Sequence, residues 1–502
     1  MKKFDHSSIK TLGDLKKAGW KSQSVKEEIR ANLIGRIKSR EPLFKGIQGY
    51  EKTVIPQIIN ALLAKHDFIL LGLRGQAKTK ILRQLSTLLD EFVPIIDGTE
   101  LRENPLHPQT SNAKQIVAEM ADNTPISWIT RDVRYAEKLA TPDTNVSDLI
   151  GDIDPIKAAS NKLSLSDEKA INFGLIPRSN RGIFAINELP DLQPRIQVAL
   201  LNIMQERDIQ IRGFSLRVPI DVLMVFSANP EDYTNRGNII TPLKDRIDAQ
   251  IITHYPKDRE VGVGITQDQA WEMRGDLVKI KVPYAYREVI EQVAIEARKS
   301  EYIDQKSGVS ARMSISAMEM VISAAETRAI RNEESETTLR LTDLYHMTPA
   351  LTGKLELVYE GEMEGPANVA RHLIGKAILN IYTQYFPDPS KKLKDKSKKS
   401  EYAQIQDWFS SGNRIDLHEY DSDEDYRAEL NKVEGLNGLI AKHLNIPGVE
   451  ATLFMDMALE AMHQHSLLSK NDLDQDVQYS DMMDSLLGGL SASEEDIDED
   501  LY

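Results

Sequence analysis

Cysteine is absent from the 502 residues of this chain, which excludes disulfides, thiolate metal sites and cysteine nucleophiles. Because such a chain tolerates a reducing compartment, we expect a cytoplasmic protein. Long apolar runs are also missing. No stretch approaches the roughly 20 apolar residues that a membrane helix needs, so we expect no membrane partner. The opening residues, MKKFDHSSIK, are basic but lead into no apolar segment, so no signal peptide is expected either.

The sequence has no basic excess, and its acidity is confined to one end. Residues 401–502 carry 24 Asp and Glu against 5 Lys and Arg, whereas the first 400 residues carry 57 basic and 53 acidic side chains. An acidic region repels nucleic acid and favours basic partners or simple solubility. With no evident helix-turn-helix or basic stripe, we do not expect nucleic acid as a partner.

Short apolar runs separated by helical segments predict an α/β fold. Residues 125–129, 182–187 and 222–227 have the length and composition of buried strands, which indicates a parallel sheet covered by helices on both faces. A hairpin is expected at 209–220, with its turn near Arg212–Gly213. Residues 8–40 have the spacing of an amphipathic helix.

Composition and periodicity divide the chain into five predicted segments. These are an N-terminal helical arm (1–40), a nucleotide-binding core (41–256), a helical lid with an extension (257–389), a lysine-rich linker (390–400) and a mostly helical acidic region (401–502), whose end is expected to be disordered.

Residues 72–79, GLRGQAKT, fit the phosphate-binding pattern G-x-x-x-x-G-K-[ST] except that Ala77 replaces its last glycine. In such a loop, backbone N–H groups surround the phosphates and glycines allow close approach. Lys78 would reach the β- and γ-phosphates, and the Thr79 hydroxyl would bind Mg²⁺. If position 77 needs a positive φ, its Cβ costs about 1–2 kcal/mol. The expected ligands are ATP and Mg²⁺, and the residues expected around them are Gly72, Arg74, Gly75, Gln76, Ala77, Lys78 and Thr79.

A second nucleotide motif is expected at the end of the predicted strand 182–187. Hydrolysis needs an acidic pair, in which the first carboxylate holds Mg²⁺ through water and the second orients and deprotonates the attacking water. Glu188 fills the second position, whereas Asn187 stands at the first and brings no charge. We therefore expect slow turnover. The alternative is that Asn187 ends the strand and caps the next turn, a structural role that is compatible with the functional one.

These motifs, with several others in the same order, carry a family likeness over residues 40–320. The segments GIQGYEKTVIPQIINALL, DLIGDIDPIKA and GLIPRSNRGIFAINELPDL resemble the AAA+ ATPase subunits of magnesium chelatase and their MoxR-like relatives. VFSANPEDY resembles a sensor-1 strand, and LKDRID an arginine-finger segment. The resemblance implies a P-loop AAA+ core with a parallel sheet flanked by helices, followed by a helical lid domain.

The resemblance also implies roles for single residues. Asn229 matches the sensor-1 position that contacts the γ-phosphate or its water, and Arg246 matches the finger that reaches a neighbouring subunit's nucleotide. Arg312 lies where sensor 2 would be in the lid. Arg178 and Arg181 flank the second motif and are weaker candidates for an interface.

A finger that acts in trans implies a homo-oligomeric ring, which we expect to be a hexamer. Such relatives often work with a partner that carries a von Willebrand A domain; no D-x-S-x-S motif occurs here, so this partner would be a separate chain. The leading hypothesis is a ring that remodels or loads a partner protein. A nucleotide-responsive scaffold with weak hydrolysis and a DNA-working AAA+ protein remain as alternatives.

Overall fold

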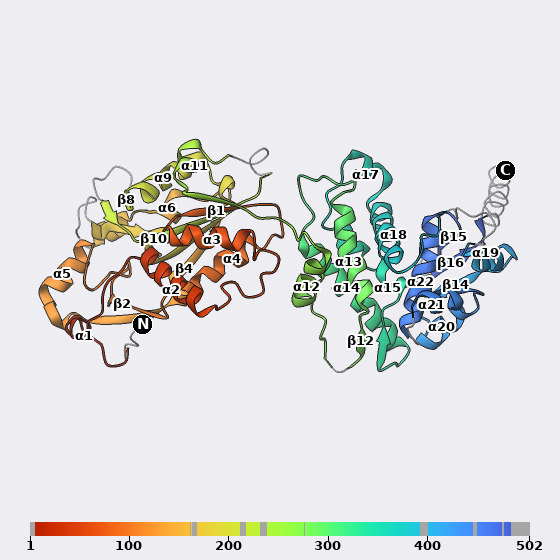
Figure 1. Cartoon of the computed structure of the whole chain (residues 1–502). Coiled ribbons are helices and arrows are strands. Elements are labelled where there is room, and N and C mark those ends of the chain that lie inside the picture. The colour runs from red at the N-terminus through yellow and green to blue at the C-terminus, as the bar shows by residue number, and fades with distance from the viewer. Residues whose placement is uncertain are drawn as a thin grey trace. The chain divides into compact units, whose positions relative to one another are not determined.

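The computed structural model describes residues 6–160, 162, 168–210, 217–230, 238–275, 277–391, 400–444, 449–473 and 476–482. The turn expected near Arg212–Gly213, most of the lysine-rich linker and the acidic end all lie outside these residues. The chain forms two compact units, 1–255 and 256–502, which are described separately (Figure 1).

The first unit is built around a five-stranded parallel sheet with the strand order β11-β1-β10-β7-β4. Its strands are β1 (Phe68–Leu71), β4 (Tyr135–Leu139), β7 (Gly182–Asn187), β10 (Val222–Ala228) and β11 (Ala249–Ile252). Three of them, β1, β10 and β7, are neighbours and buried along their whole length. All strands are parallel, so their carboxyl ends lie at one edge of the sheet, where ligands of such folds bind.

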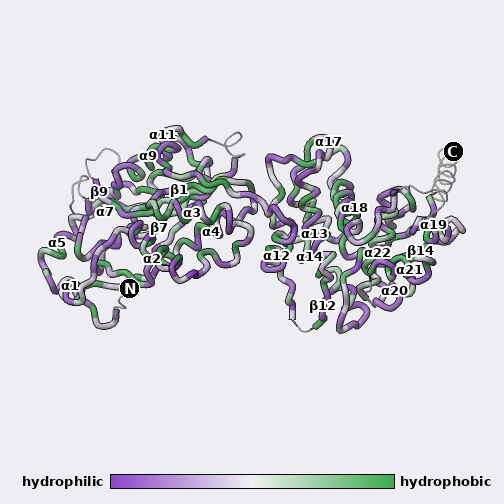
Figure 2. Tube along the Cα trace, in the orientation of Figure 1, coloured by the Kyte–Doolittle hydropathy of each residue, from purple (hydrophilic) through white to green (hydrophobic). Residues whose placement is uncertain are grey.

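Helices cover both faces of this sheet, as the near-continuous apolar strands predict. Because successive side chains of a strand point to opposite faces, Phe68 and Leu70 join one apolar core, whereas Ile69 and Leu71 join another. Figure 2 shows the apolar composition of the central strands. The helices are α1 (Leu12–Ala18), α2 (Val25–Ser39), α3 (Val54–Leu63), α4 (Lys78–Gln84), α5 (Ser111–Met120), α6 (Val146–Leu149), α7 (Pro155–Ser160), α8 (Leu175–Arg178), α9 (Pro194–Gln205) and α11 (Thr241–Arg246).

Small antiparallel pairs surround the main sheet, and one of them corrects a sequence prediction. The pairs are β2 (Phe92–Ile96) with β3 (Ile126–Thr130), β5 (Gly151–Ile153) with β6 (Ile171–Phe173), and β8 (Asp208–Gln210) with β9 (Arg217–Pro219). The predicted run 125–129 is a strand, but it pairs with β2 and not with the parallel sheet. Its residues 127–130 are not fully buried, which agrees with a strand outside the core. The expected hairpin arms are present as β8 and β9.

The segment 8–40 forms two helices, not one. Gly19 adopts φ 73° and ends α1, and the side chain of Ser24 accepts a hydrogen bond from Glu27 N to begin α2. Val25, Ile29 and Leu33 of α2 then pack into the core against β1 and β10. This N-terminal segment is therefore an integral part of the first unit's core.

The second unit is mainly helical and shares one apolar core that runs from Ala285 to Tyr479. Its helices are α12 (Arg259–Gln269), α13 (Tyr284–Ala297), α14 (Ala311–Arg331), α15 (Leu341–Tyr345), α16 (Thr348–Thr352), α17 (Tyr359–Glu364), α18 (Pro366–Tyr385), α19 (Ala403–Ser410), α20 (Asp423–Asn431), α21 (Leu436–His443) and α22 (Val449–Gln464). The strands β12 (Lys279–Lys281) and β13 (Glu336–Thr338) form a parallel pair. A three-stranded sheet that the sequence did not predict joins β14 (Ile415–His418), β16 (Asp476–Ser480) and β15 (Ser469–Leu473).

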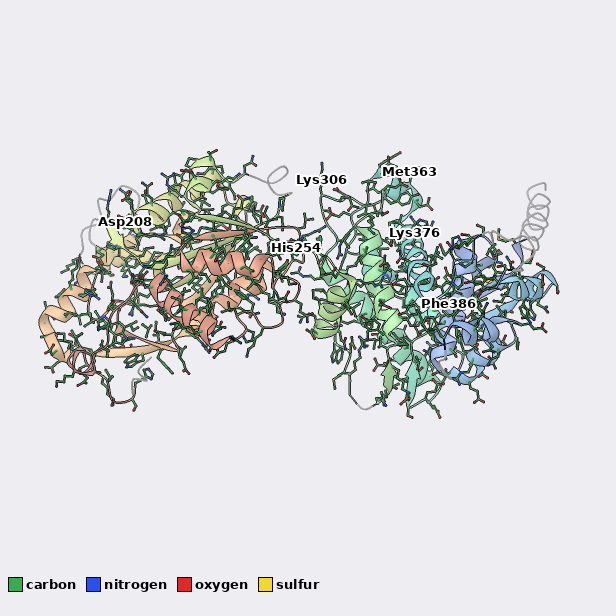
Figure 3. The ribbon with its side chains drawn as sticks, in the orientation of Figure 1. Asp208, His254, Lys306, Met363, Lys376 and Phe386 are labelled. Atoms are coloured by element: carbon green, nitrogen blue, oxygen red, sulfur yellow. The ribbon has the colours of Figure 1, made fainter. Side chains whose placement is uncertain are left out.

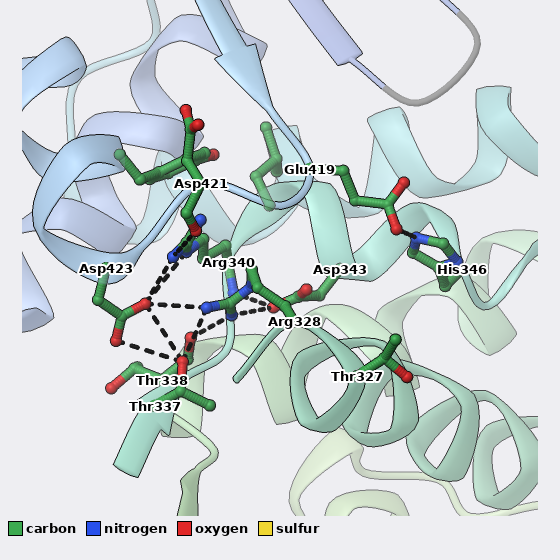
Figure 4. A network of polar contacts seen from close by, with 12 residues as sticks. Thr327, Arg328, Thr337, Thr338, Arg340, Asp343, His346, Glu419, Asp421 and Asp423 are labelled. Carbon is green, nitrogen blue, oxygen red and sulfur yellow. Dashed lines mark hydrogen bonds and ion pairs between the residues drawn. The ribbon is translucent and has the colours of Figure 1, made fainter. Parts of the chain in front are cut away.

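A buried charged network joins the start of α20 to α14 and to the segment that follows α14 (Figure 4). Arg328 of α14, which is 1% exposed, pairs with Asp343 and with Asp423, both at 2.9 Å. Arg340 adds a 2.7 Å pair to the same Asp423. Removing one partner of such a buried pair typically costs about 3–5 kcal/mol, because the other charge is left buried. The acidic start of α20 is thus a structural anchor.

Candidate functional site

The predicted phosphate-binding loop leaves the carboxyl end of β1 and leads directly into α4. Gly72 N donates a hydrogen bond to the carbonyl of Ala228, which joins the start of the loop to the neighbouring strand β10. Gly75 has φ 72° and Ala77 has φ 57°, so the loop makes two left-handed turns before the helix begins at Lys78. A strand, a glycine turn and a helix N-terminus together form the arrangement that binds phosphate groups.

Two positions of the loop show why its composition matters. A Cβ on Gly72 would lie 2.0 Å from Thr253 Oγ1 and 2.1 Å from Gln76 Oε1, so a larger residue cannot fit without a shift of these side chains. Ala77, in contrast, holds a left-handed conformation that its Cβ disfavours by about 1–2 kcal/mol. Position 77 therefore has the positive φ for which the sequence predicted this energetic cost.

Lys78 is 7% exposed, and its ammonium group lies inside the loop. Its Nζ donates to the carbonyls of Gly72 and Leu73, the latter at 3.0 Å, and to Oδ1 of Asn229 at 2.6 Å. Asn229 directly follows β10, which pairs with β1. The structure thus brings the predicted phosphate-binding lysine and the predicted sensor residue into direct contact.

Asn187, the last residue of β7, completes this edge of the sheet. Its Oδ1 accepts a hydrogen bond from Ser227 Oγ at 2.9 Å and lies 3.5 Å from Thr79 Oγ1. Hydroxyl and amide oxygens are ligands that Mg²⁺ accepts, and it usually keeps several waters beside them. The donor set of Thr79 and Asn187 therefore fits this ion, although the carboxylate that would add charge is missing.

Glu188 follows Asn187 at the carboxyl end of β7 and has φ 55°. A left-handed glutamate is uncommon and costs of order 1 kcal/mol, so its backbone is held in place by the surrounding structure. Glu188 lies one residue beyond the contact between Asn187 and Thr79. This is the side of the loop at which a carboxylate could orient a water toward the terminal phosphate.

The predicted arginines are not brought to the loop by the described contacts. Arg246, at the end of α11, is bound through Nε and Nη2 to Gln205 of α9, at 3.0 and 2.8 Å. Arg178 is exposed, whereas Arg181 is only 5% exposed. Arg312 belongs to the second unit, where it is the exposed second residue of α14.

Three side chains that the sequence did not predict form hydrogen bonds to the loop. Tyr50 OH contacts the carbonyls of Gln76 and His254, at 3.0 and 2.8 Å, and burial raises the pKa of Tyr50 to about 12. Thr253 Oγ1 donates to Gln76 Oε1 at 2.6 Å, and Tyr255 OH donates to the carbonyl of Arg74 at 2.9 Å. The sequence offers no motif for these residues, because Thr253 and Tyr255 only follow the short strand β11.

The chain is similar in sequence to a family of ATPase domains and to subunits of magnesium chelatase. Residues 163–252 match the family model of the sigma-54 interaction domain. A magnesium-chelatase subunit ChlI of Synechocystis is 24% identical over 53% of this chain and 71% of its own length. The magnesium-chelatase 38 kDa subunits of Cereibacter sphaeroides and Rhodobacter capsulatus are each 28% identical, over 65% and 59% of their own lengths. The chain thus spans only part of the relatives it matches.

Solved structures with a similar chain include one of the complex between subunits BchI and BchD of magnesium chelatase. It is 21% identical, covers 64% of this chain and 98% of that chain, and has a TM-score of 0.34. NtrX from Brucella abortus in complex with ATP is 12% identical, over 72% and 63% of the two chains, with a TM-score of 0.36.

Among the residues that the structure describes, no helix is both long and apolar enough to cross a membrane.

Proposed function

We propose that this chain, which is similar to the ATPase subunits of magnesium chelatase, hydrolyses ATP within a ring and uses the energy to remodel or load a partner protein. One observation carries the proposal: the neighbouring strands β1, β10 and β7 bring the phosphate-binding loop, Asn229 and Asn187 together at one edge of the sheet. Phosphoryl transfer requires such convergence, since its catalysis is mostly positioning and charge stabilisation.

Each residue of this edge has a distinct part in the proposed reaction. The loop and Lys78 hold the β- and γ-phosphates, and Asn229 orients the terminal phosphate or its water. Thr79 and, through water, Asn187 would hold Mg²⁺, which neutralises phosphate charge when bound. Glu188 accepts a proton from the attacking water as general base. The assignment is supported by the contact of Lys78 with Asn229 and of Thr79 with Asn187.

The first experiment is steady-state ATP hydrolysis with Mg²⁺ at several protein concentrations, comparing the wild type with Glu188→Gln. Turnover per chain should rise with protein concentration, and the variant should bind ATP but lose nearly all turnover. Turnover that stays constant on dilution argues against a ring. Full turnover in Glu188→Gln argues against the assigned base.

A ring in which Arg246 acts on the neighbour's nucleotide permits a second, independent test. Glu188→Gln and Arg246→Ala chains should each be inactive alone. When they are mixed, some interfaces combine an intact Glu188 with an intact Arg246 from the adjacent chain, so part of the activity should return. A mixture that stays inactive contradicts action in trans. A ring of six, held in the cytoplasm and coupled to a separate chain with a von Willebrand A domain, is the assembly we propose.

A nucleotide-responsive scaffold is the second candidate, because a specific observation favours it. Asn187 is 7% exposed, is bound to Ser227 and brings no negative charge to the proposed metal position. Under this alternative the purified chain binds Mg·ATP and changes its assembly state without turnover. Addition of a partner protein would then separate a true scaffold from an ATPase that waits for activation.

A DNA-working AAA+ protein is the third candidate, since residues 163–252 match the sigma-54 interaction domain model. No G-A-F-T-G-A-like loop occurs in the sequence, and the chain is acidic overall. Binding to duplex DNA that weakens steeply with salt would revive this candidate. We expect none at physiological ionic strength.

A further inference from the structure

The first unit contains a cavity at the edge of the sheet opposite the predicted phosphate-binding loop. Its volume is about 530 Å³, and its walls include residues at the amino ends of the central strands. Arg181 directly precedes β7, and Asp221 directly precedes β10. In Figure 3, Asp208, which follows Arg207 of the cavity in the chain, lies far from His254, whose carbonyl contacts the same Tyr50 hydroxyl as Gln76 of the loop.

The side chain of Arg181 is the unusual feature of this cavity. It is only 5% exposed, and its one hydrogen bond among the described residues runs from Nη1 to the carbonyl of Pro94. No described carboxylate lies within ion-pair distance of its guanidinium. Its Cζ lies 5.8 Å from the centre of the Trp20 ring, which covers it from one side.

The neighbouring Arg134 makes the charged form of Arg181 less favourable. Arg134, which is 1% exposed, donates from Nε to the carbonyl of Arg181 at 2.8 Å and adds a second positive charge nearby. That arginine is already neutralised by a bidentate pair with Glu28. Burial and the charge of Arg134 together lower the pKa of Arg181 to about 10, so it remains charged at neutral pH but at a cost.

The carboxylates in the cavity wall are already engaged by other groups. Asp221 accepts a 2.7 Å hydrogen bond from Val25 N, at the start of α2. Glu103 accepts from the backbone N of Gln109 and of Thr110, at 2.8 and 3.0 Å. Glu27 pairs with Lys65 at 3.0 Å. Among the described residues, the guanidinium of Arg181 therefore lines the cavity with one hydrogen bond, to the carbonyl of Pro94, and feels Asp221, Glu103 and Glu28 only from beyond ion-pair distance.

Two other cations of the cavity wall, Lys26 and Arg207, form ion pairs with a buried carboxylate. Lys26 and Arg207 both pair with the buried Asp67, each at 2.8 Å, and Asp248 attracts Lys26 from farther away. An oxyanion in the cavity would give the guanidinium of Arg181 the close anionic acceptor that no described carboxylate supplies. Arginine suits the purpose because its planar fork binds carboxylate and phosphate groups with two parallel hydrogen bonds.

We propose that this cavity is a second ligand site of the protein, which binds a small molecule bearing a carboxylate or phosphate group, with Arg181 as its anchor and Arg207 at its rim. The site is independent of the proposed ATPase reaction. Its occupant would contact residues at the amino ends of β7 and β10; Asn187 is the last residue of β7, and Asn229 directly follows β10.

Calorimetric titration of the full chain with inorganic phosphate and, separately, with succinate tests the proposal. The nucleotide site is first filled with Mg²⁺ and a non-hydrolysable ATP analogue, so that the phosphate-binding loop cannot supply the signal. At least one probe should bind, and Arg181→Gln should weaken it at least tenfold. Phosphate alone points to a phosphorylated ligand, and succinate alone points to a carboxylate.

Two further variants separate binding from folding. Arg207→Gln acts from the more exposed rim, where its side chain is 39% exposed, and should also weaken the probe. Arg178→Gln alters an exposed arginine three residues from Arg181 and should leave probe binding unchanged. If neither probe binds the wild type, or if both Arg181→Gln and Arg207→Gln fold and bind as the wild type does, the proposal is wrong.

Discussion

The Nζ of Lys78 lies 2.6 Å from Oδ1 of Asn229, although 151 positions separate the two residues in the chain. The contact exists because β1 and β10 are adjacent and parallel, so the residues that follow the two strands meet at one edge. The group proposed to sense the terminal phosphate therefore touches the cation proposed to bind it. This contact gives the site its most direct test.

Replacement of Asn229 by alanine should impair turnover more than ATP binding. A hydrogen bond to a charged group contributes about 1.5–3 kcal/mol, which corresponds to a tenfold to hundredfold loss in rate if the bond acts mainly in the transition state. Turnover and the dissociation constant of a fluorescent ATP analogue are measured in parallel. Lys78→Ala is the control and should lose ATP binding itself. Unchanged turnover in Asn229→Ala would remove that residue from the site.

Asn187→Asp should strengthen the use of Mg²⁺. The substitution keeps an oxygen 3.5 Å from Thr79 Oγ1 and beside Ser227, and it adds the missing negative charge at the proposed metal position. The Mg²⁺ concentration that gives half-maximal turnover should fall severalfold, and turnover itself should rise. Ser227→Ala, which removes only the hydroxyl that orients Asn187, serves as the comparison. An identical Mg²⁺ dependence in wild type and Asn187→Asp would show that this residue does not face the metal.

Ala77→Gly should stabilise the protein. Glycine adopts φ 57° without the Cβ contact that makes this conformation costly, so the free energy of unfolding should rise by about 1 kcal/mol. Ala31→Gly, in the exposed middle of α2, provides the matched control and should lower the free energy of unfolding by about 1 kcal/mol. Urea unfolding measures both. Equal losses in the two variants would contradict the strained conformation at position 77.

The stability of the second unit should depend on pH through Asp456 of α22. Burial raises the pKa of this carboxyl from 3.8 to about 7. A raised pKa means that the folded state binds the proton more tightly than the unfolded chain does, so its contribution to stability falls as pH rises from about 4 to about 7.

The wild type should therefore lose urea resistance between pH 5 and pH 8 more steeply than Asp456→Asn, which cannot ionise. Asp456 accepts hydrogen bonds from Tyr426 OH and, more weakly, from Leu341 N. Tyr426→Phe removes one of these donors but leaves the carboxyl, so it should keep the pH dependence. Parallel curves for the wild type and Asp456→Asn would assign the pH dependence to other groups.

The sequence by itself determined the local chemistry of this protein. The pattern of residues 72–79 between an apolar run and a helical segment predicted the phosphate-binding loop, and continuous burial along 182–187 and 222–227 agrees with the predicted central strands. Local signals were sufficient because a loop, a strand and a helix cap depend mainly on neighbouring residues. The absence of cysteine likewise excluded thiolate chemistry whatever the fold.

Tertiary structure alone decided how distant residues combine. The pairing of 126–130 with β2 in place of the parallel sheet, the support of the loop by Tyr50 and Thr253, and the burial of Arg181 beside a cavity leave no periodic trace in the sequence. Strand order and the burial of a charge depend on contacts between segments far apart in the chain. Such contacts are set by packing of the whole unit, and a sequence pattern cannot specify which surface arginine the fold will enclose.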